Sequence, residues 1–333
     1  MKPYLFSGIQ PSGEIHIGNY AGAIRNWIQL LDSYQSIFCI VDYHAVTVDF
    51  DREKMQERIY QAALVNMAAG LDPERCTLFV QSHVPEHTEL TWIFNTLTPM
   101  GLLGRMTQFK EKSRDNEANV NVGLFDYPVL QAADILLYKA EAVPVGEDQV
   151  QHIELTRDIA RKFNTKFAPI FPEPKALVPR EGARILGLDG ESKMSKSLNN
   201  YIGLLEPSDE VWEKLRPAKT DPQRKRRQDP GRPEMCNIFT LHKAFSPVGV
   251  QEWSSAGCTS AGIGCIDCKR ALHEEMMKTL NPIQEQARDL AEKPEVIHDV
   301  LHDGARRARE IAVATMDETR AAMGLRNKTT PSP

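Results

Sequence analysis

Two short stretches of the chain combine residue types that could bind a phosphate-rich ligand. The first is PSGEIHIGN at residues 11–19, and the second is KMSKS at residues 193–197. Glycines let the backbone approach a ligand closely, and the free amides of a helix N-terminus attract an anion. Two lysines three residues apart, with serines beside them, would bring positive charge and donors to a polyphosphate. The pair of stretches predicts a nucleotide site, although each stretch alone also suits an ordinary turn.

A third cluster contains four of the six cysteines, with the spacing C-x21-C-x6-C-x2-C. Its sequence is rich in glycine and serine rather than apolar residues, and six cysteines are too few for a secreted disulfide scaffold. Four thiolates can hold zinc or a [4Fe–4S] cluster, but structural zinc usually uses two short cysteine pairs and this chain has one. We therefore expect a metal site formed by Cys236, Cys258, Cys265 and Cys268. The other two cysteines, Cys39 and Cys76, lie in apolar runs and are expected in the core.

Composition excludes several classes of protein. The chain has 333 residues, which at roughly 150 residues per domain suggests two domains, and its 41% hydrophobic content argues against disorder. No run approaches the ~18 apolar residues of a membrane helix, and the start of the chain does not resemble a signal peptide, so we expect a cytoplasmic protein without a membrane partner. The net charge of -5 means that any contact with nucleic acid needs a local basic patch.

Predicted strands and helices alternate in the first half of the chain, and they must position these residues. Strands are predicted at residues 4–6, 37–42, 77–81 and 142–145. Helices are predicted between them, at residues 18–34, 51–70 and 85–97. Such alternation predicts an α/β domain with a parallel sheet and right-handed crossovers, in which ligands bind beyond the carboxyl ends of the strands.

The second half of the chain has a different pattern. Prolines and glycines break the periodicity from residue 163 to about residue 200, which predicts a long irregular connection. Helices are predicted after it, at residues 211–215, 274–280, 282–290 and 296–323. We therefore expect an α/β domain at residues 1–204 and a helical domain at residues 205–333.

At this point the sequence resembles the class I aminoacyl-tRNA synthetases, and more closely the bacterial tryptophanyl-tRNA synthetases. The resemblance covers almost the whole chain in the family's order. Its strings are FSGIQPSG at 6–13, HIGN at 16–19, IVDYHA at 40–45, RMTQFKEKS at 105–113, YPVLQAADILLY at 127–138, VPVGEDQVQHIELTRDIA at 143–160, GARI at 182–185 and KMSKS at 193–197.

The resemblance implies a fold and an activity. The fold is a Rossmann-like catalytic domain with a parallel sheet, followed by an all-helical domain that binds the tRNA anticodon. The activity is that of a ligase that activates L-tryptophan with ATP and Mg²⁺ and transfers it to the 3′-terminal adenosine of tRNA(Trp). The family is homodimeric, with the interface at about residues 100–170.

The resemblance also assigns residues to the ATP site. Catalytic contact with the phosphates is implied for Lys193, Ser195, Lys196 and Lys112. ATP binding is implied for Gln10, Pro11, Ser12, His16, Gly18, Asn19, Gly146, Glu147, Asp148, Ile185, Lys193, Met194, Ser195, Lys196 and Ser197. Asn19 replaces the second histidine of the family's motif, a replacement common among tryptophanyl enzymes.

Tryptophan binding is implied for a second set of residues. The set is Asp134, Phe6, Gly8, His44, Val143, Val145 and Gln149, with Asp134 as the acceptor for the indole N–H. An acceptor buried in an apolar pocket is left unpaired when a ligand lacks that N–H, which gives strong discrimination. Gln131 stands where many relatives carry methionine, so the resemblance does not define the details of the pocket rim.

The helical domain carries two further implications. Some tryptophanyl enzymes hold a [4Fe–4S] cluster on a nearly identical cysteine spacing after a DPG-x-PE-x-C stretch, here residues 229–236, so the resemblance favours iron–sulfur with structural Zn²⁺ as the alternative. Local positive charge could contact tRNA phosphates, although a charge run is usually a solvated face. The residues are Arg224, Lys225, Arg226, Arg227, Lys269 and Arg270.

Three alternatives remain at this stage. A tyrosyl-tRNA synthetase has the same architecture with a pocket for a phenol. A small-molecule adenylyltransferase shares the nucleotide site but needs no tRNA-binding domain. The third is a binding or regulatory protein descended from a synthetase.

Overall fold

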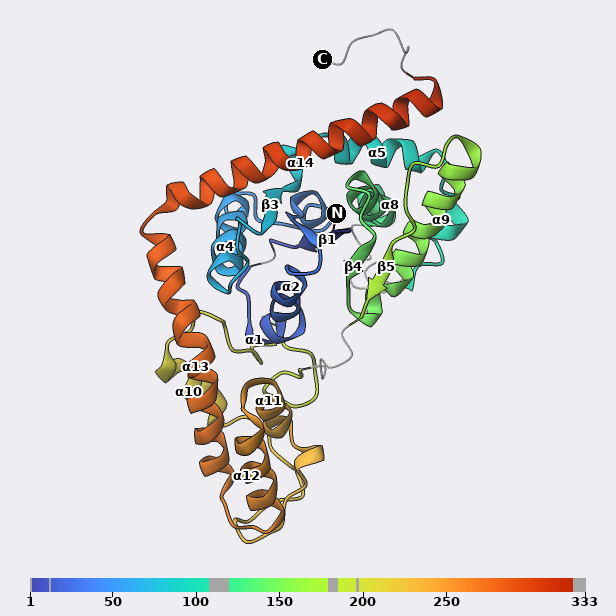
Figure 1. Ribbon diagram of the computed structural model, residues 1–333. Helices are drawn as coiled ribbons and strands as arrows, with labels where there is room; N and C mark the ends of the chain where they lie inside the picture. Colours follow the sequence, from blue (N-terminus) through green and yellow to red (C-terminus); the bar gives the residue numbers. More distant parts are fainter. Residues whose placement is uncertain (1, 12, 108–119, 179–184, 196–197, 326–333) are drawn as a thin grey trace.

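A parallel sheet of five strands organises the first half of the chain (Figure 1). The computed structural model describes residues 2–11, 13–107, 120–178, 185–195 and 198–325. The strands are β1 (Tyr4–Ile9), β2 (Gln35–Ile40), β3 (Cys76–Val80), β4 (Ala142–Pro144) and β5 (Lys175–Leu177). Their order is β3-β2-β1-β4-β5, and every pairing between them is parallel. The predicted α/β fold is confirmed, and the order reverses direction at β1, where a ligand crevice is expected.

The four predicted strands are present with shifted ends, and the sequence did not predict β5. That strand has three residues in a stretch interrupted by prolines on both sides, so it shows no periodicity of its own. It nevertheless pairs with β4 along its full length, from Ala142 beside Lys175 to Pro144 beside Leu177. Pairing with a formed edge supplies the backbone hydrogen bonds that the local sequence does not specify.

The helix after β1 begins at the HIGN motif. His16 and Asn19 form a reciprocal cap, in which the His16 N–H donates to Asn19 Oδ1 at 3.1 Å and the Asn19 N–H donates to His16 Nδ1 at 3.3 Å. The helix starts as α1 (Ile17–Asn19), passes through a π-helical turn (Tyr20–Ile24) and continues as α2 (Arg25–Leu30). Ile17, Ile24 and Trp27 are buried on its inner face and fix its position against the sheet. The motif is therefore a helix start at the carboxyl end of β1.

The other helices of the first half cover the sheet. They are α3 (Asp42–Ala45), α4 (Met55–Ala68), α5 (Glu86–Asn95), α6 (Met100–Leu103), α8 (Val122–Leu137) and α9 (Val150–Lys166), with short 3₁₀ turns at Gln81–His83 and Glu147–Gln149. Side chains of each strand alternate between two apolar clusters, one on each face of the sheet. Cys39 and Cys76 are buried, as predicted.

The second half of the described chain contains five α-helices and no strand after β5. The helices are α10 (Ser208–Leu215), α11 (Asn237–Phe245), α12 (Val248–Thr259), α13 (Cys265–Ala291) and α14 (Pro294–Met323), with a 3₁₀ turn at Pro233–Met235. The separate helices predicted at 274–280 and 282–290 are wrong, because α13 continues through Pro282. Proline removes one helical hydrogen bond, and the buried neighbours Leu280 and Ile283 hold the helix in place across it.

Figure 1 shows α10, α11, α12 and most of α13 extending away from the sheet, whereas α14 returns across α4, β3 and α5. Ala308, Ala312 and Met316 of α14 are fully buried in the cluster on one face of the sheet. The last helix therefore packs on the sheet of the first half of the chain. None of the helices in the described ranges combines the length and apolarity needed to cross a membrane.

Candidate active site

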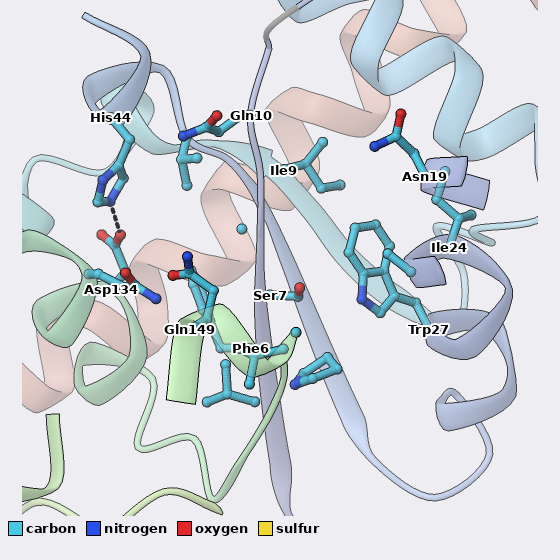
Figure 2. Close-up of a pocket in the computed structure, with 18 of the residues that line it drawn as sticks. Phe6, Ser7, Ile9, Gln10, Asn19, Ile24, Trp27, His44, Asp134 and Gln149 are labelled. Carbon is cyan, nitrogen blue, oxygen red and sulfur yellow. Dashed lines mark hydrogen bonds and ion pairs between the residues drawn. The ribbon is translucent and has the colours of Figure 1, made fainter. Parts of the chain in front are cut away.

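A cavity of about 530 Å³ opens at the carboxyl ends of β1 and β4. Figure 2 shows His44, Asp134 and Gln149 on one side of β1, and Asn19, Ile24 and Trp27 on the other. Residues of β1, the following helix, α8, the β4 loop and the KMSKS segment all contribute to its wall. The cavity thus lies at the point where the strand order reverses, as expected for a parallel sheet.

The structure brings four of the residues implied in ATP binding to this wall, namely Gln10, Asn19, Gly146 and Lys193. Lys193 reaches it because its backbone pairs with Leu186 in an isolated bridge, and its carbonyl accepts a hydrogen bond from Asn200 Nδ2 at 3.2 Å. Residues of the stretch 13–19 and Lys193 therefore face one cavity, although they are far apart in sequence.

Other residues implied in ATP binding lie beside the cavity rather than on its wall. Met194 is buried with its sulfur beside Gly18, and the Ser195 N–H donates to Asn200 Oδ1 at 2.8 Å. Pro11, Glu147, Asp148 and Ile185 are described and do not line the cavity. Four residues implied by the resemblance lie outside the described residues, namely Ser12, Lys112, Lys196 and Ser197.

All seven residues implied in tryptophan binding line the cavity, as does Gln131. They are Asp134, Phe6, Gly8, His44, Val143, Val145 and Gln149. Phe6, Gly8 and the two valines supply a largely apolar wall around the carboxylate of Asp134. The arrangement suits a flat apolar ring that carries one hydrogen-bond donor.

Asp134 is 1% exposed and accepts three hydrogen bonds. His44 Nε2 donates to Oδ2, and both Gln81 Nε2 and His87 Nδ1 donate to Oδ1, each at 2.7 Å. Burial raises the pKa of Asp134, but the charge of His44 and the hydrogen bonds from His44 and His87 outweigh it and lower the pKa to about 2. The carboxylate is consequently ionised at neutral pH and acts only as an acceptor.

Gln81 and His87 were not among the residues predicted from sequence. Gln81 directly follows β3, and a polar residue at the carboxyl end of a buried parallel strand was the available signal. His87 lies in α5 between Glu86 and Thr88, and its sequence gives no signal of a role at the site. Only the fold brings it to Asp134.

The four clustered cysteines lie near one another as free thiols. Cys236 precedes α11, Cys258 is in the last turn of α12, and Cys265 and Cys268 are in the first turn of α13. Burial raises the pKa of Cys268 to about 11, a hydrogen bond with Ser254 opposes this, and the other three cysteines add to the rise. Within the described ranges, however, no three His, Cys, Asp or Glu side chains are arranged as ligands of one metal ion. The donor set suits a metal group, but the positions of the thiols do not form its site.

Two of the six basic residues expected at tRNA phosphates are buried. Lys269 is 4% exposed, and its Nζ donates to the carbonyl oxygens of Arg216 and Ala218. Arg224 is 8% exposed and donates to the carbonyl oxygens of Arg227 at 3.0 Å and Ile263 at 2.6 Å. Because their donors bond backbone carbonyls of other segments, these two buried side chains hold the fold together and do not face solvent.

The remaining basic residues are exposed. Lys225, Arg226 and Arg227 lie at the surface, and the guanidinium of Arg270 lies over the ring of Trp212 at 5.6 Å. Asp229 Oδ2 accepts the backbone N–H groups of Lys225 and Arg226, so the turn that carries them is fixed while their side chains stay free to reach outward.

Comparison with known proteins gives a consistent result along the chain. The family described as "tRNA synthetases class I (W and Y)" matches residues 2–281. A tryptophan–tRNA ligase of Deinococcus radiodurans is 53% identical over 324 residues, which cover 96% of this chain and 98% of the relative. One of Wolinella succinogenes is 43% identical over 98% of this chain and 99% of its own. The crystal structure of tryptophanyl-tRNA synthetase from Campylobacter jejuni, complexed with ADP and tryptophan, superimposes with a TM-score of 0.87 at 37% identity, covering 96% of this chain and 99% of that chain.

Proposed function

The chain belongs to the class I tRNA synthetases for tryptophan and tyrosine, and within this family we infer that it is a tryptophan–tRNA ligase. It activates L-tryptophan with ATP to tryptophanyl-adenylate and pyrophosphate, then transfers the tryptophanyl group to the 3′-terminal adenosine of tRNA(Trp) and releases AMP. The observation that carries this conclusion is 53% identity to a tryptophan–tRNA ligase over nearly the whole of both chains.

The activation step needs orientation and charge stabilisation more than acid–base chemistry. An oxygen of the tryptophan carboxylate forms a bond to the α-phosphorus of ATP while the bond from that phosphorus to the bridging oxygen breaks, and pyrophosphate leaves with the electron pair. Lys193 is the described lysine on the cavity wall and stabilises the charge that builds on the phosphates. We assign Lys112 and Lys196 to the same role from the family resemblance. Mg²⁺ bound to the phosphates would neutralise further charge.

Asp134 supplies the selectivity for tryptophan in this proposal. Its ionised carboxylate faces a cavity with apolar walls and has no hydrogen to donate, so it favours a ring that offers an N–H. A phenylalanine side chain would leave a buried charge without its ligand donor, which is unfavourable. His44 contacts the same carboxylate and thereby helps to set its orientation.

ATP–pyrophosphate exchange with tryptophan and tyrosine side by side, followed by charging of tRNA(Trp), tests the function. We expect exchange with tryptophan and a charged tRNA(Trp). Exchange with tyrosine in its place would identify a tyrosyl-tRNA synthetase. Exchange without charging would identify a small-molecule adenylyltransferase.

The four clustered cysteines form a second proposal, which is that they hold a [4Fe–4S] cluster, with Zn²⁺ as the alternative. An all-thiolate donor set, one CxxC pair and the mutual proximity of the four side chains support it. Because the described thiols are not in ligand positions, binding requires them to move together, and no catalytic step depends on the group. Its role would be to hold together the ends of α11, α12 and α13.

Anaerobic purification with iron, zinc and acid-labile sulfide analysis tests the cluster. About four iron and four sulfide per chain are expected for [4Fe–4S]. One zinc without sulfide would select the alternative, and protein free of both would contradict metal binding.

We further propose a homodimer that joins through about residues 100–170 and an anticodon-binding role for residues 205–333. Exposed apolar residues support the first part: Trp92 is 73%, Met100 75% and Val122 81% exposed, on the neighbouring helices α5, α6 and α8. Such residues are unusual at a free surface and common in interfaces. Light scattering of the wild type and of Val122→Asp tests it, with a loss of dimer expected in the variant; a monomeric wild type would contradict it.

A further inference from the structure

We propose that His87 and Tyr138 are positioning residues that fix Asp134 as an acceptor with one free site, so that two side chains outside the pocket help to select the indole N–H. The inference rests on the proposed tryptophan activity. Neither residue lines the cavity, and both are 0% exposed.

Tyr138, His87 and Asp134 form a chain of two hydrogen bonds, and the direction of donation in both can be derived. His87 Nδ1 lies 2.7 Å from Asp134 Oδ1, and His87 Nε2 lies 2.7 Å from the Tyr138 hydroxyl. The ionised carboxylate cannot donate, so the hydrogen of this contact is on Nδ1. Burial raises the pKa of the Tyr138 hydroxyl well above its ordinary value, so the hydroxyl keeps its hydrogen.

The direction of the second contact follows from the hydroxyl. His87 Nε2 is its hydrogen-bond partner in the described part of the chain. If Nε2 also carried a hydrogen, the hydroxyl hydrogen would be buried without an acceptor, which is unfavourable. The consistent arrangement is therefore donation from Tyr138 to His87 Nε2 and from His87 Nδ1 to Asp134.

Gln81 fixes the same carboxylate oxygen from another element. Its Nε2 donates to Asp134 Oδ1 at 2.7 Å, while its Oε1 accepts the backbone N–H of Tyr43 at 3.1 Å, which determines how the amide is oriented. Oδ1 thus receives two buried donors, a number that fills its two lone-pair sites. Among the described residues, Oδ2 receives one donor, from His44, and keeps one site for a ligand. The network therefore leaves a single free acceptor position on a carboxylate that lines the cavity.

Tyr138→Phe tests the chain with little change in packing. The ring of Tyr138 stacks on the ring of Phe6 with 5.7 Å between the ring centroids. It meets the ring of Phe79 edge-on with 5.8 Å between the centroids, and phenylalanine would keep both contacts. Without the hydroxyl, His87 Nε2 loses the hydrogen bond that holds the imidazole ring in place, so the donation from Nδ1 to Asp134 is less well oriented. We expect tryptophan to bind several-fold more weakly, about the size of one lost neutral hydrogen bond.

A tryptophan analogue in which sulfur replaces the indole N–H separates this role from a structural one. The wild type should bind tryptophan much more tightly than the benzothiophene analogue. Tyr138→Phe should weaken tryptophan binding and leave binding of the analogue unchanged, so that the ratio of the two affinities falls. Equal loss for both ligands, or an unchanged ratio, would overturn the proposal.

Two variants of His87 keep the test decisive if Tyr138→Phe alters the fold. His87→Asn retains a donor at the place of Nδ1 and should keep most of the discrimination, whereas His87→Leu should lose it. Phe79→Leu, which changes packing near the same rings without removing a hydrogen bond, should affect both ligands equally. Thermal unfolding checks each variant. A wild type that activates no tryptophan would contradict the proposed function itself. A wild type that activates tryptophan, with variants that still distinguish tryptophan from the analogue, would contradict only the role of His87 and Tyr138.

Discussion

Gly304 of α14 lies directly against the backbone of Leu78 in β3, and a methyl group on its Cα would lie 1.8 Å from the Leu78 carbonyl oxygen. No real Cβ fits at that distance, so the helix and the strand are in backbone contact. Since β3 is an edge strand, α14 covers an edge that would otherwise be open to pairing with other chains. The last helix of the chain thereby protects the sheet that carries the active site.

Gly304→Ala should therefore destabilise the protein, because either α14 or β3 has to move. Overpacking of this kind costs about 1–3 kcal/mol of unfolding free energy, measured by urea denaturation. Gly249→Ala is the matched control, since Gly249 is in α12 and has nothing within 4 Å of the added methyl group. Alanine there should leave stability unchanged or raise it by up to about 1 kcal/mol. Equal effects of the two changes would mean that the close contact is unimportant.

The contact also illustrates what the sequence could predict. Hydrophobic patterns located β1 to β4 and the helices α2, α4, α5 and α14, because period and burial are local properties of the chain. They did not predict α8, α9, α11 or α12. The placement of α14 on β3 was not predictable, since one glycine among helix-forming residues carries no information about its partner. The same holds for β5, whose pairing depends on the exposed edge of β4.

The candidate site shows a similar division. Motif strings indicated the residues on the cavity wall, such as Asp134 and Gln149, because their types and order are distinctive. They gave no information on His87 and Gln81, which reach Asp134 only through the fold. Charge runs were also ambiguous: Lys225 is exposed as expected, but Lys269 is buried because backbone carbonyls surround its amine.

The pair Asp221 and Arg232 should make stability depend on pH. Arg232 donates to Asp221 from its guanidinium at 2.7 and 3.2 Å, and the backbone N–H groups of Arg232 and Gln223 donate at 2.9 and 3.0 Å. The guanidinium hydrogen bonds, and then the backbone ones, hold the pKa of Asp221 well below its usual range. A carboxyl group with a depressed folded pKa stabilises the fold above its unfolded pKa of about 3.9 and loses this contribution as pH falls below it.

We therefore expect Asp221→Asn to be less stable than the wild type at pH 7 and the difference to shrink progressively as the pH falls below about 5. Urea unfolding at a series of pH values measures it. The matched control is Asp32→Asn, because Asp32 pairs with Arg75 at the surface and is highly exposed. A surface pair contributes little, so this variant should track the wild type at every pH. A constant gap between the wild type and Asp221→Asn would contradict the assignment.

Lys193→Ala should slow adenylate formation by about 10²–10³-fold while tryptophan affinity changes little. The lysine faces the cavity, whereas its backbone is held by Leu186 and Asn200, so truncation of the side chain leaves the segment in place. Pre-steady-state activation kinetics with a separate tryptophan titration measure both quantities. Lys219→Ala, which removes an exposed lysine paired with Glu191 near the same segment, should change neither. Loss of affinity with an unchanged rate would remove the phosphate role.

Variants in the basic turn at residues 224–227, which follows α10, should distinguish a role in tRNA binding from a role in stability. Replacing Lys225 and Arg226 by glutamine removes exposed charge from a turn that Asp229 keeps in shape through backbone N–H groups. If both side chains contact tRNA phosphates, the KM for tRNA should rise several-fold at low salt, and the slope of log affinity against log salt should fall by about 0.7–0.9 per lost contact. ATP–pyrophosphate exchange should not change, because the activation site does not include this turn.

Arg224→Gln is the informative comparison, since the four basic residues look alike in sequence. Its guanidinium donates to the carbonyl oxygens of Arg227 and Ile263, so its loss leaves two partly buried acceptors without this donor and should lower the thermal stability. Charging kinetics at several salt concentrations, together with thermal unfolding, distinguish the two effects. Equal damage to exchange and charging by the Lys225 and Arg226 double variant would show that the turn supports the fold rather than the tRNA.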